Sequence, residues 1–174
     1  MNTELVKSVI RDIPDFPVKG VIFKDITTIL QDKVAFAEVA NEMKTVYSNL
    51  GITKVVGIES RGFIYGAILA KDIDAGFVPI RKPGKLPAET ISKSYAKEYG
   101  VDTIEIHKDA ITEDDVVLIH DDILATGGTI LAAYELVKDM NPKTIYINFI
   151  AELEFLKGRE LLPADVDVKA LITF

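Results

Sequence analysis

A short segment in the second half of the chain combines acids, hydroxyls and glycines directly after an apolar run. Residues 116–129 read VVLIHDDILATGGT, so Asp121 and Asp122 follow the apolar residues and a small-residue turn comes next. In an open α/β sheet, ligands bind outside the carboxyl ends of the strands, which predicts that both carboxylates lie at a crevice. Carboxylates there can accept hydrogen bonds from the vicinal hydroxyls of a sugar.

The turn after the two acids has the composition of a monophosphate site. It comprises Ala125, Thr126, Gly127, Gly128 and Thr129. Its backbone N–H groups, its two hydroxyls and the N-terminus of a following helix would together form a socket for a phosphate group. Acids for a sugar diol beside such a socket predict a ribose 5-phosphate site.

The same residues can also be interpreted as purely structural, without a ligand. An isolated pair of aspartates before glycines usually ends a strand and makes a tight turn, because Asp and Gly dominate turns. The whole segment favours the ligand site. It matches neither the Walker phosphate loop nor the glycine-rich dinucleotide fingerprint, so those two common phosphate sites are not indicated.

The elements that must position these residues follow an α/β rhythm. Two β-branched runs, 55–58 and 116–119, each precede a turn and then an apolar pattern of helical length. Further strands are predicted at 77–80, 144–150 and 168–174. Because these runs look buried on both faces, we expect a mostly parallel central sheet flanked by helices.

Two segments repeat apolar residues at helical spacing, and each is predicted to be a helix with one buried face. The repeating positions are Val34, Ala37, Ala40, Met43, Tyr47 and Leu50 in the first, and Ile130, Ala133, Tyr134, Val137 and Met140 in the second. Gly127, Gly128 and Thr129 precede the second pattern. We therefore expect its N-terminus to be capped and closely approachable.

Two stretches depart from the α/β rhythm. Residues 13–29 are rich in Pro, Gly and Asp, and residues 81–107 are long, charged and interrupted by Pro83, Gly84 and Pro87. Neither resembles packed core. A long excursion from a compact domain is usually functional or disordered, and the lysines of the second one suit a mobile lid over an anion.

Size and composition restrict the class of protein. A chain of 174 residues predicts one domain, and 48% hydrophobic residues are enough for a sizeable core. The net charge of -7 disfavours nucleic acid as a partner, and the lack of cysteine excludes disulfides and thiolate sites. With no apolar run near the roughly 20 residues that span a bilayer and no signal-peptide pattern, we expect a cytoplasmic protein without a membrane partner.

The segment 116–129 closely resembles the phosphoribosyl diphosphate signature of the type I phosphoribosyltransferases. Four further segments lie in family order and narrow the resemblance to members that use adenine. They are PDFPVKGVIFKDIT (14–27), GIESRGFIYG (57–66), VPIRKPGKLP (78–87) and SYAKEYGVDTIEIHKDAI (94–111). The resemblance implies the family's α/β fold in one domain, with an N-terminal hood at about 13–29 and a flexible catalytic loop at about 85–107.

The implied reaction transfers the 5-phosphoribosyl group of 5-phosphoribosyl 1-diphosphate to adenine, giving AMP and diphosphate. Its transition state has oxocarbenium character, so the site must stabilise the departing diphosphate. The resemblance implies that Ser60, Arg61, Arg81, Lys82 and Lys85 contact the diphosphate, with Arg61 also catalytic. It implies Mg²⁺ bound mainly through the substrate, with no direct protein ligand.

Two residues of the implied catalytic loop match the family's Glu-Tyr-Gly element. Glu98 is the implied general acid/base for the proton at adenine N7, and Tyr99 accompanies it in the loop. Without the flanking match, Glu98 would be an exposed loop glutamate. Tyr95, earlier in the same segment, is ambiguous between lid packing and no role.

The segment 14–27 resembles the family's adenine hood. The resemblance implies that the backbone of Ile22 and Lys24 reads the base edge, that Phe23 stacks on the base, and that Ile123 or Leu124 covers its other face. Many relatives carry Arg where this chain has Lys24, a mild change if only the backbone is used. Many also carry an aliphatic residue at His120, which we interpret as a partly buried structural imidazole.

Two other functions stay open at this level. A transferase for a 6-oxopurine would need a donor facing the base carbonyl, and the hood segment argues against it. A non-catalytic regulator that binds phosphoribosyl diphosphate would need an added basic DNA-binding module, which a single domain of charge -7 does not offer. The family resemblance also implies a homodimer.

Overall fold

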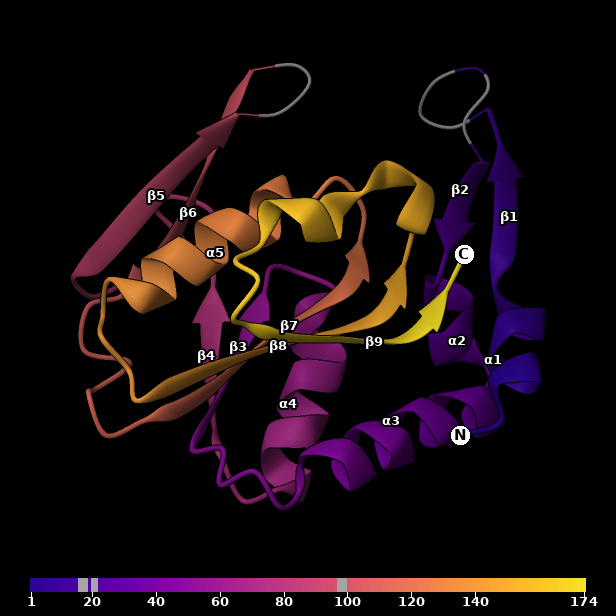
Figure 1. The fold of residues 1–174 in the computed structure, drawn as a ribbon, viewed down its shortest axis with the longest axis horizontal. Helices are drawn as coiled ribbons and strands as arrows, with labels where there is room; N and C mark the ends of the chain where they lie inside the picture. Colours follow the sequence, from indigo (N-terminus) through magenta and orange to yellow (C-terminus); the bar gives the residue numbers. More distant parts are fainter. Residues whose placement is uncertain (16–18, 20–21, 97–99) are drawn as a thin grey trace. The chain divides into compact units, whose positions relative to one another are not determined.

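The computed structural model describes residues 1–15, 19, 22–96 and 100–174, which fall into two compact units (Figure 1). The first unit is Met1–Val46 and the second is Tyr47–Phe174. The segment predicted to be the hood lies in the first unit. All other predicted site residues belong to the second, and the expectation of a single domain stays a prediction.

The second unit is built on a parallel sheet of five strands. In spatial order these are β4 (Gly76–Ile80), β3 (Lys54–Ile58), β7 (Val116–Leu124), β8 (Thr144–Glu152) and β9 (Asp167–Thr173). Every neighbouring pair is parallel, and each of the five strands predicted from sequence is one of them. The chain moves outward from β3 to β4 in one direction and from β7 to β9 in the other. The strand order therefore reverses between β3 and β7, where ligands bind in sheets of this kind.

Two helices cover opposite faces of this sheet, α4 (Gly62–Asp72) on one and α5 (Gly128–Lys138) on the other (Figure 1). The predicted apolar face of α5 is confirmed, since Ile130, Ala133, Tyr134 and Val137 are buried in the main core. Short 3-10 helices, η1 (Glu154–Leu156) and η2 (Gly158–Leu161), follow β8.

The segment 81–107, which departs from the α/β rhythm in the sequence, contains a regular hairpin. β5 (Thr90–Ala96) pairs antiparallel with β6 (Val101–His107), from Thr90 opposite His107 to Ala96 opposite Val101. The expectation that this stretch lies outside the core was wrong, because Ile104 and Ile106 are buried in the main core. Their alternation with polar neighbours is a strand pattern that charge and proline content obscured.

The first unit contains α1 (Thr3–Val9), β1 (Arg11–Pro14), β2 (Ile22–Asp25), α2 (Thr27–Gln31) and most of α3 (Lys33–Tyr47). β1 and β2 form an antiparallel hairpin. Helix α3 was predicted, but its buried row is Ala35, Val39, Met43 and Tyr47, whereas Val34 is 49% exposed. Two overlapping rows have helical spacing here, and hydrophobicity alone does not distinguish them.

Among the described residues, the structure contains no helix with the length and apolar character needed to cross a bilayer.

Candidate active site

Two adjoining cavities, of about 290 and 200 Å³, lie at the carboxyl ends of β3 and β7. They share Arg61, Asp121, Asp122 and Thr129. The smaller cavity is also lined by the remaining predicted phosphate residues, which are Ala125, Thr126, Gly127 and Gly128, and by Ile123. The larger one is also lined by Ser60, Arg81 and Lys82. The sheet therefore brings the residues predicted for ribose phosphate and for diphosphate into neighbouring spaces.

The two acids belong to β7 itself, which continues to Leu124 rather than ending before them. Asp122 is 3% exposed, and its backbone N–H donates to Oδ1 of Asp121 at 2.9 Å. Burial, together with the neighbouring charge of Asp122, raises the pKa of Asp121 well above its ordinary value. α4 begins at Gly62, and a Cβ at that position would lie only 3.1 Å from Oδ1 of Asp121. Glycine there makes room for the acid.

Arg61 connects the residues predicted for the diphosphate with those predicted for the ribose phosphate. Its guanidinium forms an ion pair with Asp122 through Nε, and its Nη2 donates to Oδ1 of Asp122 at 3.3 Å. The side chain of Arg61 is 45% exposed while that of Asp122 is buried. A planar fork matches a carboxylate in this way, and it can equally bind phosphate oxygens.

The phosphate turn, residues 125–129, is shaped by close backbone contacts. Gly127 has φ +85°, a conformation that favours glycine. A Cβ on Gly127 would overlap the carbonyl oxygen of Gly158, and a Cβ on Gly158 would overlap that of Ala125. The segment at Gly158 thus packs directly behind the turn, a contact that the sequence did not indicate.

The helix after the turn begins without a side-chain cap. Gly127 is the N-cap residue and α5 starts at Gly128, so Thr129 lies inside the helix and no side chain among the described residues caps it. The expectation of a capped N-terminus was wrong. Because Thr129 lies two residues after the N-cap position, its hydroxyl is directed to other groups.

The basic segment after β4 is organised by an acid that sequence reasoning missed. Glu59 accepts hydrogen bonds from Nη2 and Nε of Arg81, at 3.0 and 3.2 Å, and from the backbone N–H of Lys82 at 3.0 Å. The Arg81 hydrogen bond is the main reason why the pKa of Glu59 is lowered. Arg81 also donates to the carbonyl of Lys85 at 3.3 Å, whereas Lys85 does not line either cavity. The position of Glu59 at the end of β3 was the available signal.

The β5–β6 hairpin contributes two further residues, Tyr95, whose role the sequence left ambiguous, and Asp102, which was given no role. Tyr95 and Asp102 line the larger cavity and lie opposite each other in the hairpin. The hydroxyl of Thr129 donates to that of Tyr95 at 3.0 Å, and the Tyr95 hydroxyl lies 3.5 Å from Oδ2 of Asp102. Only the hairpin register brings these residues together, so the sequence held no direct signal for them.

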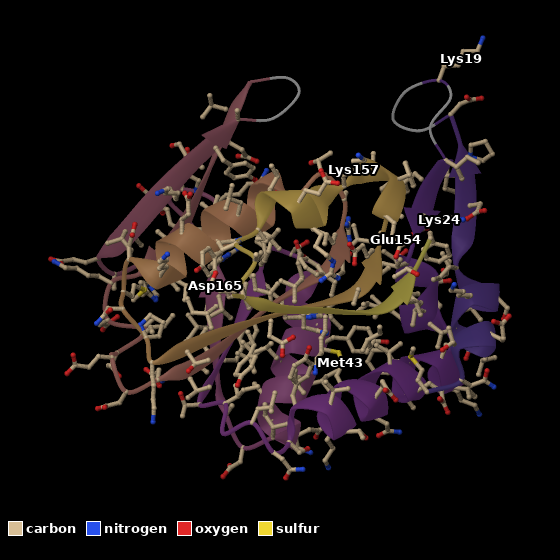
Figure 2. All side chains as sticks on the ribbon, viewed as in Figure 1. Lys19, Lys24, Met43, Glu154, Lys157 and Asp165 are labelled. Carbon is tan, nitrogen blue, oxygen red and sulfur yellow. The ribbon has the colours of Figure 1, made fainter. Side chains whose placement is uncertain are left out.

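The residues predicted for adenine are distributed over both units. Ile22, Phe23 and Lys24 lie on β2, with Ile22 52% exposed, and Ile123 lies on β7. Nζ of Lys24 donates to Asp12 at 2.7 Å, and Figure 2 shows the Lys24 side chain extending from β2. The ammonium group therefore has a local partner, as expected if only the backbone of this residue reads a base.

The predicted catalytic-loop residues Glu98 and Tyr99 lie outside the described residues.

His120 is completely buried, more deeply than the partly buried imidazole that was expected. Its Nδ1 lies 2.8 Å from Oδ1 of Asn148, its register partner on β8. Burial lowers the pKa of His120 to about 4, so the imidazole is neutral near pH 7. The structural interpretation of this residue is confirmed.

The carboxylates that line the cavities suit a metal ion whose other ligands are substrate oxygens and water. Within the described part of the chain, no three His, Cys, Asp or Glu side chains are grouped closely enough to hold a metal ion. Mg²⁺ is commonly bound by one or two carboxylates together with substrate phosphates and water. Asp121 and Asp122 can supply such carboxylates.

Comparison with known proteins gives a consistent result. Residues 25–168 match the model of the phosphoribosyl transferase domain family. The chain is 57% identical over 173 residues to an adenine phosphoribosyltransferase from Bacteroides thetaiotaomicron, covering 99% of this chain and 98% of that protein.

Solved structures agree with the sequence comparison. One is an adenine phosphoribosyltransferase from Rhodothermus marinus, with 48% identity, a TM-score of 0.91, and coverage of 99% of this chain and 98% of that one. Another is the Giardia lamblia enzyme complexed with 9-deazaadenine, with 44% identity, a TM-score of 0.93, and coverage of 100% and 98%. The predicted fold class is confirmed by these relatives and by the parallel sheet.

Proposed function

This chain belongs to the adenine phosphoribosyltransferases, which transfer the 5-phosphoribosyl group of 5-phosphoribosyl 1-diphosphate to adenine, and we propose how its residues divide this reaction. One bond forms, between adenine N9 and the anomeric carbon, while the bond from that carbon to diphosphate breaks and its electron pair leaves with the diphosphate. The observation that carries the assignment is the pair of cavities joined at Arg61, Asp121 and Asp122.

The smaller cavity is assigned to the ribose 5-phosphate. Ala125, Thr126, Gly127, Gly128 and Thr129 bind the phosphate through backbone N–H groups and the two hydroxyls. Asp121 and Asp122 accept hydrogen bonds from the ribose hydroxyls. The burial of Asp122 and the lining of this cavity support the assignment.

The larger cavity is assigned to the diphosphate. Ser60, Arg61, Arg81 and Lys82 line it, and Lys85 is added from the family resemblance. Arg61 and Arg81 each hold a carboxylate, Asp122 and Glu59 respectively, at moderate exposure. Each guanidinium can turn part of its hydrogen bonding to an incoming phosphate, and positive charge held at the leaving group stabilises the transition state.

Magnesium binds with the substrate in this assignment. When bound, Mg²⁺ neutralises charge on the diphosphate. Asp121 and Asp122 would contact it indirectly, through water, while the substrate supplies most of its oxygen ligands.

The base is assigned by resemblance to the family. Ile22 and Lys24 read its edge through the backbone, Phe23 stacks on it, and Ile123 contacts its other face. Glu98 accepts the proton that adenine gives up at N7 as N9 bonds to the ribose, with Tyr99 beside it in the loop. We also assign a homodimer and a cytoplasmic location from the resemblance; light scattering on the purified protein tests the first, and cell fractionation the second.

One experiment tests the base assignment and the phosphoribosyl diphosphate site independently of each other. Purified protein is mixed with magnesium, phosphoribosyl diphosphate and, separately, adenine, hypoxanthine, guanine and xanthine, and nucleotide formation is followed. AMP from adenine alone is the expected result. IMP, GMP or XMP would contradict the base assignment, and binding of phosphoribosyl diphosphate without any product would favour a regulator.

Glu98→Gln tests the proton transfer. We expect turnover to fall at least about 100-fold, the usual contribution of general acid/base catalysis, with little change in phosphoribosyl diphosphate binding. Glu89→Gln is the matched control, because Glu89 is an exposed glutamate whose carboxylate lies 3.7 Å from Lys108 and which lines neither cavity. Equal activity of the two variants would remove Glu98 from the proposed role.

A further inference from the structure

The first turn of α5 is in direct contact with the β5–β6 hairpin. Ala96 and Tyr95 lie over Gly128, so that a Cβ on that glycine would be 3.6 Å from the carbonyl oxygen of Ala96 and from Cδ2 of Tyr95. Further along the same two elements, Lys93 forms an ion pair with Glu135 at 3.0 Å. The hairpin is therefore held against the helix at two places besides any contact of the Tyr95 hydroxyl.

The Tyr95 hydroxyl lies between a phosphate-turn residue and an acid. It accepts a hydrogen bond from Thr129 Oγ1 at 3.0 Å and is directed to Oδ2 of Asp102 at 3.5 Å. The second distance is at the limit of a hydrogen bond, so that interaction is weak. The ring of Tyr95 packs against the main hydrophobic core, which determines where its hydroxyl lies.

Each of these two hydroxyls has one proton, and each can rotate. A phosphate oxygen is a stronger hydrogen-bond acceptor than a phenol oxygen. A phosphate in the turn would therefore accept the hydrogen bond that the Thr129 hydroxyl donates. The Tyr95 proton can then turn from Asp102 to Thr129 Oγ1, giving up its long hydrogen bond to Oδ2 of Asp102. A hydroxyl that accepts a hydrogen bond is also a better donor, so the reversed chain strengthens the bond to phosphate.

We propose that Tyr95 is a positioning residue for the 5-phosphate of the substrate, acting by donating a hydrogen bond to Thr129. This inference rests on the proposed phosphate role of Thr129. It extends the 5-phosphate site to a residue outside the phosphate turn, and it makes the β5–β6 hairpin part of ribose 5-phosphate recognition.

A double-mutant cycle tests the proposal with ribose 5-phosphate as the probe. Its dissociation constant is measured by calorimetry for the wild type, Tyr95→Phe, Thr129→Val and the double variant. We expect Tyr95→Phe to weaken binding about 3- to 10-fold, the value of one hydrogen bond. In the Thr129→Val background, Tyr95→Phe should have no further effect on the dissociation constant. The Tyr95 hydroxyl acts on the phosphate through the Thr129 hydroxyl, which valine lacks.

Two controls distinguish positioning from a general structural effect. Tyr146→Phe removes a hydroxyl from a half-buried tyrosine on β8 that lines neither cavity, and it should bind ribose 5-phosphate like the wild type. The KM for adenine should be the same in Tyr95→Phe and the wild type, since the lost bond acts only on the phosphate.

Wild-type affinity of Tyr95→Phe would overturn the proposal, and so would equal weakening by this change in both backgrounds. If Thr129→Val itself binds ribose 5-phosphate normally, both this inference and the proposed role of Thr129 fail. Weakening by Thr129→Val without weakening by Tyr95→Phe would leave the proposed function intact and remove only the role of Tyr95.

Discussion

The two ends of the proposed active site are constructed differently. At the ribose-phosphate end, backbone atoms of Gly127 and Gly158 pack so closely that neither position has room for a Cβ, and Asp122 is almost fully buried. At the diphosphate end, Arg81 and Glu59 are side chains with 32% and 21% exposure that hold each other by charge. The first end depends on shape, which solvent does not screen, whereas the second depends on charges that salt weakens.

Gly127→Ala should have the largest effect, because it attacks the shape of the phosphate turn. Alanine at a positive φ costs about 1–2 kcal/mol, and its Cβ also overlaps the Gly158 carbonyl, so the turn must move. We expect the affinity for phosphoribosyl diphosphate to fall about 100-fold or more. Binding is measured by calorimetry.

Gly51→Ala is the control for backbone strain. Gly51 has φ +66° with no atom within 4 Å of its Cβ position, so the substitution adds strain without overlap. It should lower the free energy of unfolding by about 1–2 kcal/mol and leave binding unchanged. If the two variants bind alike, close packing is not what maintains the turn, and the contrast between the two ends is lost.

Arg61→Lys should have the second largest effect, since Arg61 connects the two ends. Lysine keeps the charge but cannot hold Asp122 through two nitrogens while also reaching the diphosphate. We expect kcat/KM for phosphoribosyl diphosphate to fall about 100-fold. Steady-state kinetics give the value, and a thermal melt verifies that the variant is folded. A change of less than about threefold would show that charge alone is sufficient there.

His120, next to the acids of the ribose-phosphate end, makes the stability of the folded protein depend on pH. Its pKa, about 4 in the folded protein, lies below the ordinary 6.5, so the unfolded chain binds a proton first as the pH falls. Stability from this group is complete above pH 6.5 and decreases by about 3 kcal/mol as the pH falls to 4. Asp121 acts in the opposite sense, because its raised pKa makes the folded protein lose stability as the pH rises above 3.8.

The His120 contribution is isolated by difference. Urea unfolding is measured from pH 4 to 7.5 for the wild type and for His120→Asn, whose amide can still reach Asn148. The difference between the two free energies should change by about 3 kcal/mol over this range. If the free energies of unfolding of the two proteins changed with pH in parallel, His120 would not be a neutral, buried imidazole. The ribose-phosphate end would then carry charge as the diphosphate end does.

Glu59→Gln should have the smallest effect and should depend on salt. Glutamine loses the charge that holds Arg81, but exposed ion pairs of this kind contribute only about 1 kcal/mol. We expect the KM for phosphoribosyl diphosphate to rise about fivefold at low ionic strength, and by less in 0.5 M salt because the wild-type pair is then screened. A loss that is equal at both salt concentrations would show that Glu59 acts through geometry instead of charge.

The sequence alone predicted the strands of the sheet and the turn at 125–129, whose phosphate role stays a prediction. Strands β3, β4, β7 and β8 each contain an apolar run, as buried parallel strands require, whereas the edge strand β9 carries Asp167 and Lys169 and is only partly buried; the acids and glycines of 121–129 are close together in the chain. These features are local, so periodicity and composition identify them. The resemblance to the family added adenine and the diphosphate, which composition did not indicate.

Only the tertiary structure determined the contacts between distant segments. The register of the β5–β6 hairpin places Tyr95 opposite Asp102 and beside Thr129, and the chain returns after β8 to put Gly158 behind Gly127. Likewise, Glu59 meets Arg81 because parallel β3 and β4 end at the same edge of the sheet. Such contacts depend on register and on distances across the fold, which local preferences do not encode.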